Sequence, residues 1–281
     1  MRTSIHSYVW VSDWTTESGV AAAERARQFG FDHLVVPLRD HATVEPERLA
    51  REFSRIGIVP LVTSTLRPEN DISSTDSEQH RRGVAYHLES LRIARDMGAP
   101  HVGGVLYSAL HRYDRAPTPD NLKAAAAGLS VVADQARKMG LTLALEVVNR
   151  YETNLINTVD QAVELITDVG ADNLFLHLDT FHMNIEENNL SAALKRALPY
   201  LFYFELDQNH RGRLSDGAIR FEPLLEILRE SAYDRILGIE AFSGAVSGPR
   251  PRVSVAAWRK LFASGDEVAA DGRQLLDRVL G

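Results

Sequence analysis

The sequence predicts a (β/α)8 barrel, because strand and helix patterns alternate along the whole chain, the strand patterns number eight, and the chain has 281 residues. Alternation of this kind implies parallel strands that are joined by right-handed crossovers. Eight such units in about 250 residues is the usual size of this barrel. The alternative is an open doubly wound sheet, but no G-x-G-x-x-G motif follows the first strand pattern. We expect one domain that covers residues 1–281.

The predicted strands are short runs of apolar and β-branched residues between turn residues. In chain order they cover Thr3–Trp10, Phe31–Leu38, Gly57–Thr65, His101–Tyr107, Leu141–Val148, Asn173–Asp179, Tyr200–Asp207 and Ile236–Phe242. Several are apolar at nearly every position, which is typical of strands that are buried on both faces of a parallel sheet.

The predicted helices have apolar residues at helical spacing, and a glycine or proline follows several of them. They cover Thr16–Phe29, Val44–Ile56, Ser77–Met97, Asp120–Met139, Thr158–Val169, Leu190–Leu198, Phe221–Ser231 and Arg252–Leu280. The polar, turn-rich segment Arg67–Asp76 is expected to be a loop.

Composition excludes some classes of function. The net charge is −7 and no long basic run is present, which weighs against nucleic-acid binding. The chain has no cysteine, so it offers neither a thiol nucleophile nor a thiolate metal site. The first ten residues lack a signal pattern, and no apolar run reaches membrane-spanning length. We expect a cytoplasmic protein without a nucleic-acid or membrane partner.

Four consecutive strand patterns each carry an acid near the carboxyl end, where the active sites of such barrels lie. These acids are Glu146, Asp179, Glu205 and Glu240. Neighbouring strands lie about 4.8 Å apart, so the four carboxylates should converge. A shared divalent cation would offset their repulsion, and an all-oxygen ligand set favours Mn²⁺ or Mg²⁺. The alternative is that each acid only caps a turn or pairs with an arginine.

Several motifs resemble the D-tagatose/D-psicose (allulose) 3-epimerase family of the xylose isomerase-like TIM barrel superfamily. The motifs are LALEVVNRYETNLINT from residue 143, LHLDTFHMNIEE from residue 176, NHRG from residue 209 and IEAF from residue 239. GGVLYS on the fourth strand pattern and DISS from Asp71 also fit. The resemblance covers most of the chain and implies an isomerase: a ketose 3-epimerase of carbohydrate metabolism.

The resemblance also implies roles for individual residues. The metal and catalytic acids of the family fall on Glu146, Asp179 and Glu240, and its substrate-contacting residues fall on Glu152, His182 and Arg211. In the family, two glutamates stand on opposite faces of the sugar. One removes the C3 proton, a cis-enediolate forms, and the other glutamate reprotonates the opposite face.

One position departs from the family pattern, because Glu205 stands where the family has a histidine ligand. The expected ligand set is therefore Glu146, Asp179, Glu205 and Glu240 around one divalent ion, with Mn²⁺ first and Mg²⁺ or Co²⁺ as alternatives. The added negative charge should raise the pKa of the least tightly bound carboxylate. It should also disfavour the enediolate unless a cation such as Arg211 compensates.

The residues themselves allow a two-sided mechanism. Glu146 and Glu240 lie three strands apart around the predicted ring, so they can face each other across a substrate as catalytic acid and base. Tyr8 and Tyr107 end predicted strands and could form an apolar wall for a sugar, although core packing explains them nearly as well. We interpret Glu186 and Glu187 as solvated charges near a helix start.

Other functions stay open at this point. The same barrel could hold an isomerase or epimerase of a sugar phosphate, a short ketose or hydroxypyruvate, and Arg67, Arg211 and Arg213 are candidate phosphate ligands. A non-catalytic sugar-binding barrel is a further alternative. A DNA-repair endonuclease would need a histidine-rich zinc cluster and a basic face, which the acid set and net charge disfavour. We expect a sugar substrate and a homo-oligomer, a dimer or tetramer.

Overall fold

Eight parallel strands close into one barrel, each hydrogen-bonded to its sequence neighbours, with β1 pairing with β8. The computed structural model describes the backbone of residues 1–280 and the side chains of residues 1–278, and Gly281, the end of the expected domain, lies outside them. The strands are β1 (Arg2–His6), β2 (His33–Leu38), β3 (Val59–Ser64), β4 (His101–Gly104), β5 (Thr142–Val147), β6 (Leu174–Asp179), β7 (Leu201–Leu206) and β8 (Ile236–Ile239). The predicted (β/α)8 barrel is confirmed.

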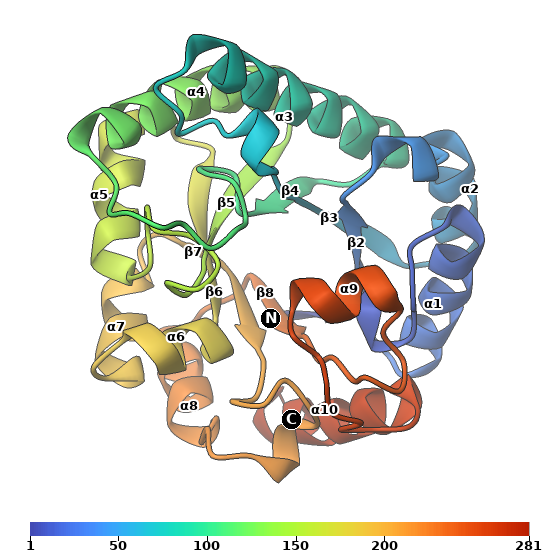
Figure 1. Cartoon of the computed structure of the whole chain (residues 1–281). Coiled ribbons are helices and arrows are strands. Elements are labelled where there is room, and N and C mark those ends of the chain that lie inside the picture. Colours follow the sequence, from blue (N-terminus) through green and yellow to red (C-terminus); the bar gives the residue numbers. More distant parts are fainter. Residues whose placement is uncertain (281) are drawn as a thin grey trace.

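The helices form a ring outside the strands, and α9 is set inward from that ring (Figure 1). They are α1 (Thr16–Gln28), α2 (Pro46–Ile56), α3 (Ser77–Met97), α4 (Pro119–Lys138), α5 (Val159–Val169), α6 (Thr180–Glu186), α7 (Leu190–Ala197), α8 (Glu222–Glu230), α9 (Pro249–Ser254) and α10 (Gly265–Leu280). No helix in the described part of the chain has the length and apolarity that a membrane crossing requires.

Three of the expected strands are too long, because the chain leaves the sheet early at the carboxyl end. The first strand ends at His6, whose ring accepts a hydrogen bond from the Tyr8 amide and caps a short 3-10 turn. The fourth ends at Gly104, where φ is 102° and a Cβ would collide with the backbone of Ser64. The eighth ends at Ile239, directly before Glu240.

Two helix predictions need correction. The expected helix Arg252–Leu280 is two helices, because the chain between α9 and α10 turns at Ala256, where φ is 52°. The short helix α6 was not predicted. Asp179 caps it, since its Oδ1 accepts hydrogen bonds from the amides of Phe181 (2.7 Å) and His182 (3.3 Å).

The inside of the barrel below the acids is filled by side chains. Val35, Leu61, Tyr203 and Ile236 are buried together there, and the Tyr203 ring contacts the ring of His177. A larger apolar layer packs the helices onto the outer face of the sheet. This packed interior fixes the strand ends from which the acids project.

Candidate active site

The register of the sheet brings the predicted acids to one level of the barrel. Asp179 pairs with Glu205 across β6 and β7, and Glu146 pairs with His177 across β5 and β6. Glu205 pairs with Gly238 of β8, two residues before Glu240. Asp179, Glu205 and Glu240 are buried, and Glu146 is half-buried. Four carboxylates therefore gather at the carboxyl end of the barrel, as the strand patterns predicted.

Three further residues of this site were missed by the sequence reasoning. His177 and Asp207 lie two positions from Asp179 and Glu205, so strand alternation turns them to the same side. His6 ends β1, and its Nε2 lies 3.5 Å from Oε1 of Glu240. The alternation of side chains along a strand could have identified His177 and Asp207. Only the closed barrel brings His6 next to Glu240.

Arg211 extends among the acids as their internal counter-charge. Its Nε donates to Oδ2 of Asp207 (2.6 Å), and its Nη2 pairs with Oε2 of Glu240. The same guanidinium lies 3.9 Å from Oδ2 of Asp179 and 4.0 Å from Oε1 of Glu152. It is held in a left-handed backbone conformation with φ of 61°. Burial alone would lower the pKa of Arg211, but the surrounding carboxylates outweigh burial and raise it.

The rings of Phe181 and Phe242 also hold Arg211. Their centroids lie 4.5 Å and 4.6 Å from its Cζ, so two aromatic faces contact the same cation. The left-handed backbone at Arg211 is uncommon for a residue with a side chain and costs on the order of 1–3 kcal/mol. Ion pairs and ring contacts together fix the guanidinium within the acid cluster.

Five of the carboxyl groups in and around this site resist ionisation. Burial, followed by neighbouring carboxylates, raises the pKa of Glu146 well above its usual range. Burial is also the main cause of the raised pKa values of Asp179, Glu205 and Asp207. The pKa of Glu152 rises for the same reason, although Arg211 opposes the shift. A cation among these groups would favour their charged forms.

Two glutamates each face a neutral histidine. Burial lowers the pKa of His6 to about 4 and also lowers the pKa of His182. Nδ1 of His6 accepts from the Tyr8 amide and Nδ1 of His182 accepts from the Asn149 amide, so each neutral ring carries its proton on Nε2. Those Nε2 atoms lie 3.5 Å from Glu240 and 3.7 Å from Glu146.

The donor set fits a divalent cation. Ligand atoms gather within 4.8 Å of one another in three overlapping groups: Glu146 with His177 and Glu205, Glu146 with Asp179 and His182, and Asp179 with Asp207 and Glu240. Oδ2 of Asp179, Oδ1 of Asp207 and Nδ1 of His177 are buried without a hydrogen-bond partner among the described atoms. Unpartnered buried acceptors of this kind are costly, and a bound cation would satisfy them. The four predicted ligands are spread over these groups rather than joined in one.

A small cavity with a volume of about 50 Å³ opens onto these groups. We call it the inner cavity. Among the residues that line it are Tyr8, Glu146, Glu152, His177, His182, Glu205, Arg211 and Glu240.

Two of the predicted site residues do not line the inner cavity. Asp179 is fully buried behind its wall. Tyr107 is also fully buried, and its hydroxyl donates to the carbonyl oxygens of Glu146 and Ile156, both at 3.0 Å. Of the two interpretations of Tyr107, the structure supports core packing and corrects the expected contact with substrate.

Glu186 and Glu187 also differ from their predicted role as solvated charges. The side chain of Glu186 is only 5% exposed and binds Arg150. Oε1 of Glu187 accepts from the Val159 amide at the start of α5. Both acids fix the segment that follows Asp179.

The sequence profile of the xylose isomerase-like TIM barrel family matches residues 14–264. The chain belongs to this family. Within the family, it is 35% identical to an L-ribulose 3-epimerase of Mesorhizobium japonicum, over 98% of this chain and 93% of that protein. It is 31% identical to a ketose 3-epimerase of Arthrobacter globiformis, over 96% and 93% of the two chains.

The solved structures agree with this family. A D-allulose 3-epimerase from Methylomonas sp. in complex with D-allulose is 28% identical and superimposes with a TM-score of 0.96, over 99% of this chain and 97% of that one. These relatives confirm the expected resemblance and the expected class of enzyme, an epimerase.

Proposed function

We propose that this chain is a metal-dependent ketose 3-epimerase. The observation that carries the proposal is the pair Glu146 and Glu240, which reach one cavity from β5 and from the end of β8. Inversion of a stereocentre needs a base on one face of the substrate and an acid on the other. The epimerase relatives, matched over nearly the whole chain, supply the reaction and the ketose class of substrate.

In this proposal Glu146, Asp179, Glu205 and Glu240 hold the divalent ion, and the unpartnered Nδ1 of His177 is a further candidate ligand. When bound, the ion supplies Lewis-acid polarisation of the substrate carbonyl and the neighbouring hydroxyl. Mn²⁺ is our proposal for its identity, since carboxylate ligands suit Mn²⁺ and Mg²⁺.

The two glutamates exchange protons with C3. One, as carboxylate, removes the proton from C3, and the electron pair of the C–H bond passes into the enediolate. The other, as carboxylic acid, then delivers a proton to C3 from the opposite face. One turnover thus protonates the first group and deprotonates the second, and exchange with water restores both. The Nε2–H groups of His182 and His6 face Glu146 and Glu240, where they stabilise the carboxylate forms.

The remaining polar side chains orient the sugar. Arg211 offers positive charge beside the developing enediolate, and Glu152 can accept from a terminal hydroxyl. Tyr8 lies against Phe242 with 5.9 Å between ring centroids, so the two form the apolar wall on the His6 side of the cavity.

Exchange of solvent deuterium into C3 of ketoses tests the proposal. We expect Glu146→Gln and Glu240→Gln each to lower exchange and epimerisation by about 10²–10⁴-fold, because each removes one acid–base group. Glu226→Gln, at an exposed glutamate far from the site, is the matched control. If either site variant keeps more than about a tenth of wild-type activity with metal bound, the two-base mechanism is wrong. If the wild-type protein shows no exchange, the remaining interpretation is a non-catalytic sugar-binding barrel.

Three further expectations stay predictions. Elemental analysis of protein purified without chelator tests the metal and its identity. Light scattering tests the expected homo-oligomer. Fractionation of the producing cell tests the cytoplasmic location.

A further inference from the structure

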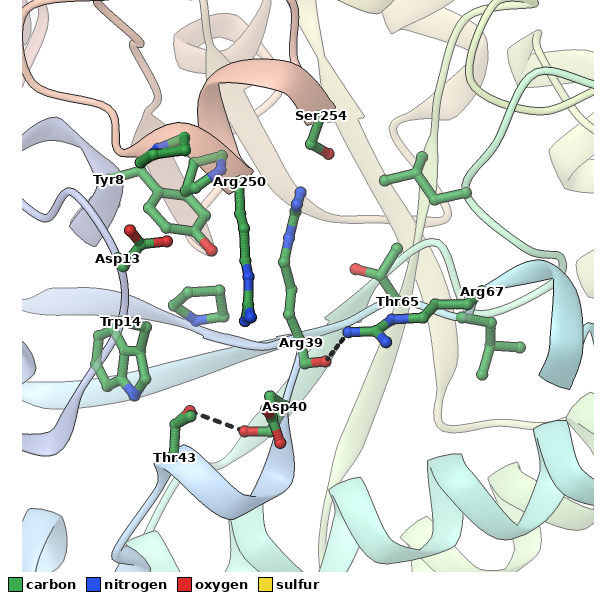
Figure 2. Close-up of a pocket in the computed structure, with 15 residues that line it drawn as sticks. Tyr8, Asp13, Trp14, Arg39, Asp40, Thr43, Thr65, Arg67, Arg250 and Ser254 are labelled. Carbon is green, nitrogen blue, oxygen red and sulfur yellow. Dashed lines mark hydrogen bonds between the residues drawn. The ribbon is translucent and has the colours of Figure 1, made fainter.

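A second and larger cavity, which we call the outer cavity, adjoins the inner cavity and has a volume of about 590 Å³ (Figure 2). The two cavities share five wall residues: Tyr8, Pro37, Arg39, Thr65 and Leu110. Two segments far apart in the chain close it, since α9 contributes Pro249 and Ser254 whereas the segment after β2 contributes Asp40 and Thr43. A molecule that reacts at Glu146 and Glu240 can therefore extend into the outer cavity.

The small size of the inner cavity favours such an extension. A volume of about 50 Å³ holds only a few water molecules. A ketose is larger than a few water molecules, so we place its reacting carbons in the inner cavity and the rest of the substrate in the shared region and beyond. The residues of the outer cavity consequently contact the end of the substrate that leaves the inner site.

Three arginines from three different segments meet at the outer cavity. Arg39 follows β2, Arg67 follows β3, and Arg250 lies in α9. Figure 2 shows Arg39 and Arg250 extending from opposite walls and Arg67 approaching from a third side. Nη2 of Arg67 lies 3.5 Å from the carbonyl oxygen of Arg39.

These guanidinium groups are not paired with acidic side chains of the protein. Among the described side chains, those of Arg39, Arg67 and Arg250 form no ion pair. Arg39 contacts the Tyr8 ring instead, with 5.8 Å from its Cζ to the ring centroid. Other arginines do form ion pairs, as Arg213 does with Asp216. Unpaired arginines around a cavity leave their donors available to an anion.

Two acids share the outer cavity and do not cancel this charge. Asp40 turns back to its own backbone, since its Oδ1 accepts from the Ala42 amide at 3.1 Å. Asp13 lines the wall beside Tyr8 and Trp14. Three arginines thus outnumber two aspartates in the outer cavity, whereas carboxylates crowd the inner one. The balance of charge in the outer cavity therefore favours an anionic group there.

We infer that the substrate carries an anionic group, a phosphate ester or a carboxylate, on the end that leaves the inner site, and that Arg39, Arg67 and Arg250 bind it. The inference rests on the proposed epimerase function and names its substrate class: a ketose phosphate or a keto sugar acid rather than a free ketose. Guanidinium groups bind both anions by paired N–H donors, so the shared chemistry is a multidentate oxyanion.

Binding of unreactive probes tests the anion site without catalysis. Calorimetry compares sorbitol 6-phosphate, gluconate and sorbitol on the wild-type protein and on the Arg67→Gln/Arg250→Gln double variant. We expect at least one anionic probe to bind the wild type tenfold or more tightly than sorbitol. The double variant should lose about tenfold or more of that affinity, because hydrogen bonds to charged groups are removed. Arg229→Gln, at an exposed arginine paired with Glu226, is the matched control and should bind like the wild type.

The three probes separate the sources of the anion. Tighter binding of sorbitol 6-phosphate than of gluconate assigns a phosphate ester, and the reverse order assigns a carboxylate. Equal binding of sorbitol and both anions, or an unchanged affinity in the double variant, would overturn the inference.

Kinetics then distinguish this inference from the proposed function. The readout is the ratio of kcat/KM for a ketose phosphate to kcat/KM for the same free ketose, measured by deuterium entry at C3. We expect a ratio above ten that falls at least tenfold in the double variant. Exchange into free ketoses with a ratio near one refutes the anion site but leaves the epimerase. Arginine-dependent binding of an anionic probe without exchange into any ketose or its phosphate refutes the epimerase but leaves the anion site.

Discussion

Both oxygens of Glu205 already have a partner in the protein. The Tyr203 hydroxyl donates to Oε1 (2.9 Å), and Nε2 of His177 lies 3.0 Å from Oε2. Burial lowers the pKa of His177 to about 3, so the ring is neutral and donates through Nε2. The partners of Glu205 are therefore uncharged, and its negative charge still needs a cation.

Replacement of Glu205 by histidine tests whether it binds the metal. If Glu205 is a ligand, Glu205→His exchanges a hard oxygen for an imidazole nitrogen and removes one negative charge. We expect the variant to fold, to bind metal and to shift its preference from Mn²⁺ towards Co²⁺. Titration of both ions into both proteins measures the shift, with Glu226→His as the exposed control. An unchanged ratio of the Mn²⁺ and Co²⁺ affinities would exclude Glu205 as a ligand.

Arg211 offers a second test at the same scale. Arg211→Gln leaves Asp207, Glu240 and Asp179 without their counter-charge, and loss of one partner from a buried ion pair costs about 3–5 kcal/mol. We expect the variant to be destabilised in EDTA and to gain more stability from Mn²⁺ than the wild type does. Urea unfolding with and without Mn²⁺ measures both effects. An equal gain from Mn²⁺ in the two proteins would show that the ion and Arg211 do not compensate the same charges.

The site was predictable where one strand carries the information or where a motif resembles the family, as at Glu152, His182 and Arg211. An acid within an apolar strand identified Glu146, Asp179, Glu205 and Glu240 as neighbours. His6 faces Glu240 across 234 positions of sequence, and no local pattern connects such residues. The outer cavity was equally hidden, because two of its three arginines follow β2 and β3 and the third lies in α9. Arg67 was predicted as a candidate phosphate ligand, but together with two arginines that do not line the outer cavity.

Helix ends were predicted more accurately than strand ends, because a helix end has a local chemical signal. Helices α2, α3 and α5 end at the expected residues, and Gly57, Gly98 and Gly170 follow in left-handed conformations that glycine adopts without strain. A strand in a closed barrel ends where its neighbour leaves the sheet, which its own residues do not specify. Helix α6 was missed because Asp179 was interpreted only as a ligand, although one of its oxygens caps that helix.

The contact between β7 and β8 depends on a residue without a side chain. A Cβ at Gly238 would overlap the Tyr203 hydroxyl, which also donates to Glu205. We expect Gly238→Ala to cost about 1–3 kcal/mol through overpacking and to displace the Glu205 carboxylate. Urea unfolding measures the first effect and Mn²⁺ affinity the second. Gly98→Ala, in a left-handed cap far from the acids, is the control that should lose stability but keep its Mn²⁺ affinity. A fully stable Gly238→Ala variant would mean that the two strands can move apart.

At the scale of the whole molecule, the barrel could be predicted because it follows from the count and order of elements. Eight alternations in one chain leave few topologies, and the right-handed crossover rule selects among them. The division of the C-terminal segment into α9 and α10 could not be predicted, since both halves carry helix-forming residues. Residues of α9 line the outer cavity together with residues that follow β2 and β3, and no local pattern predicts such long-range contacts.

Buried neutral histidines make the stability of the barrel depend on pH. Burial lowers the pKa of His87 to about 4, and its ring bonds Ser64 (3.1 Å) and the Leu106 carbonyl (3.0 Å). Between pH 6.5 and about 4 the unfolded chain binds a proton that the folded one excludes. The contribution of His87 to stability is therefore complete above pH 6.5 and falls as the pH is lowered, by up to about 1.4 kcal/mol per pH unit for each such group.

Urea unfolding at pH 7.5 and pH 5 measures this dependence. We expect His87→Gln to be less stable than the wild type at pH 7.5 but to lose less on acidification, because one excluded proton is gone. His111→Gln, at a partly exposed histidine, should keep the wild-type dependence. The same loss on acidification in all three proteins would show that His87 does not contribute.

The pairing of β1 with β8 has a consequence for how the enzyme is made. Glu240 directly follows the last strand to be synthesised, and its neighbour His6 ends the first. The two residues meet only when β1 pairs with β8 and closes the barrel, and contacts between residues far apart in sequence form slowly. A nascent chain that lacks its final strand holds Glu146 and Asp179 but not the opposing glutamate. The two glutamates of the proposed mechanism are therefore brought together late, and an unfinished chain lacks the second of them.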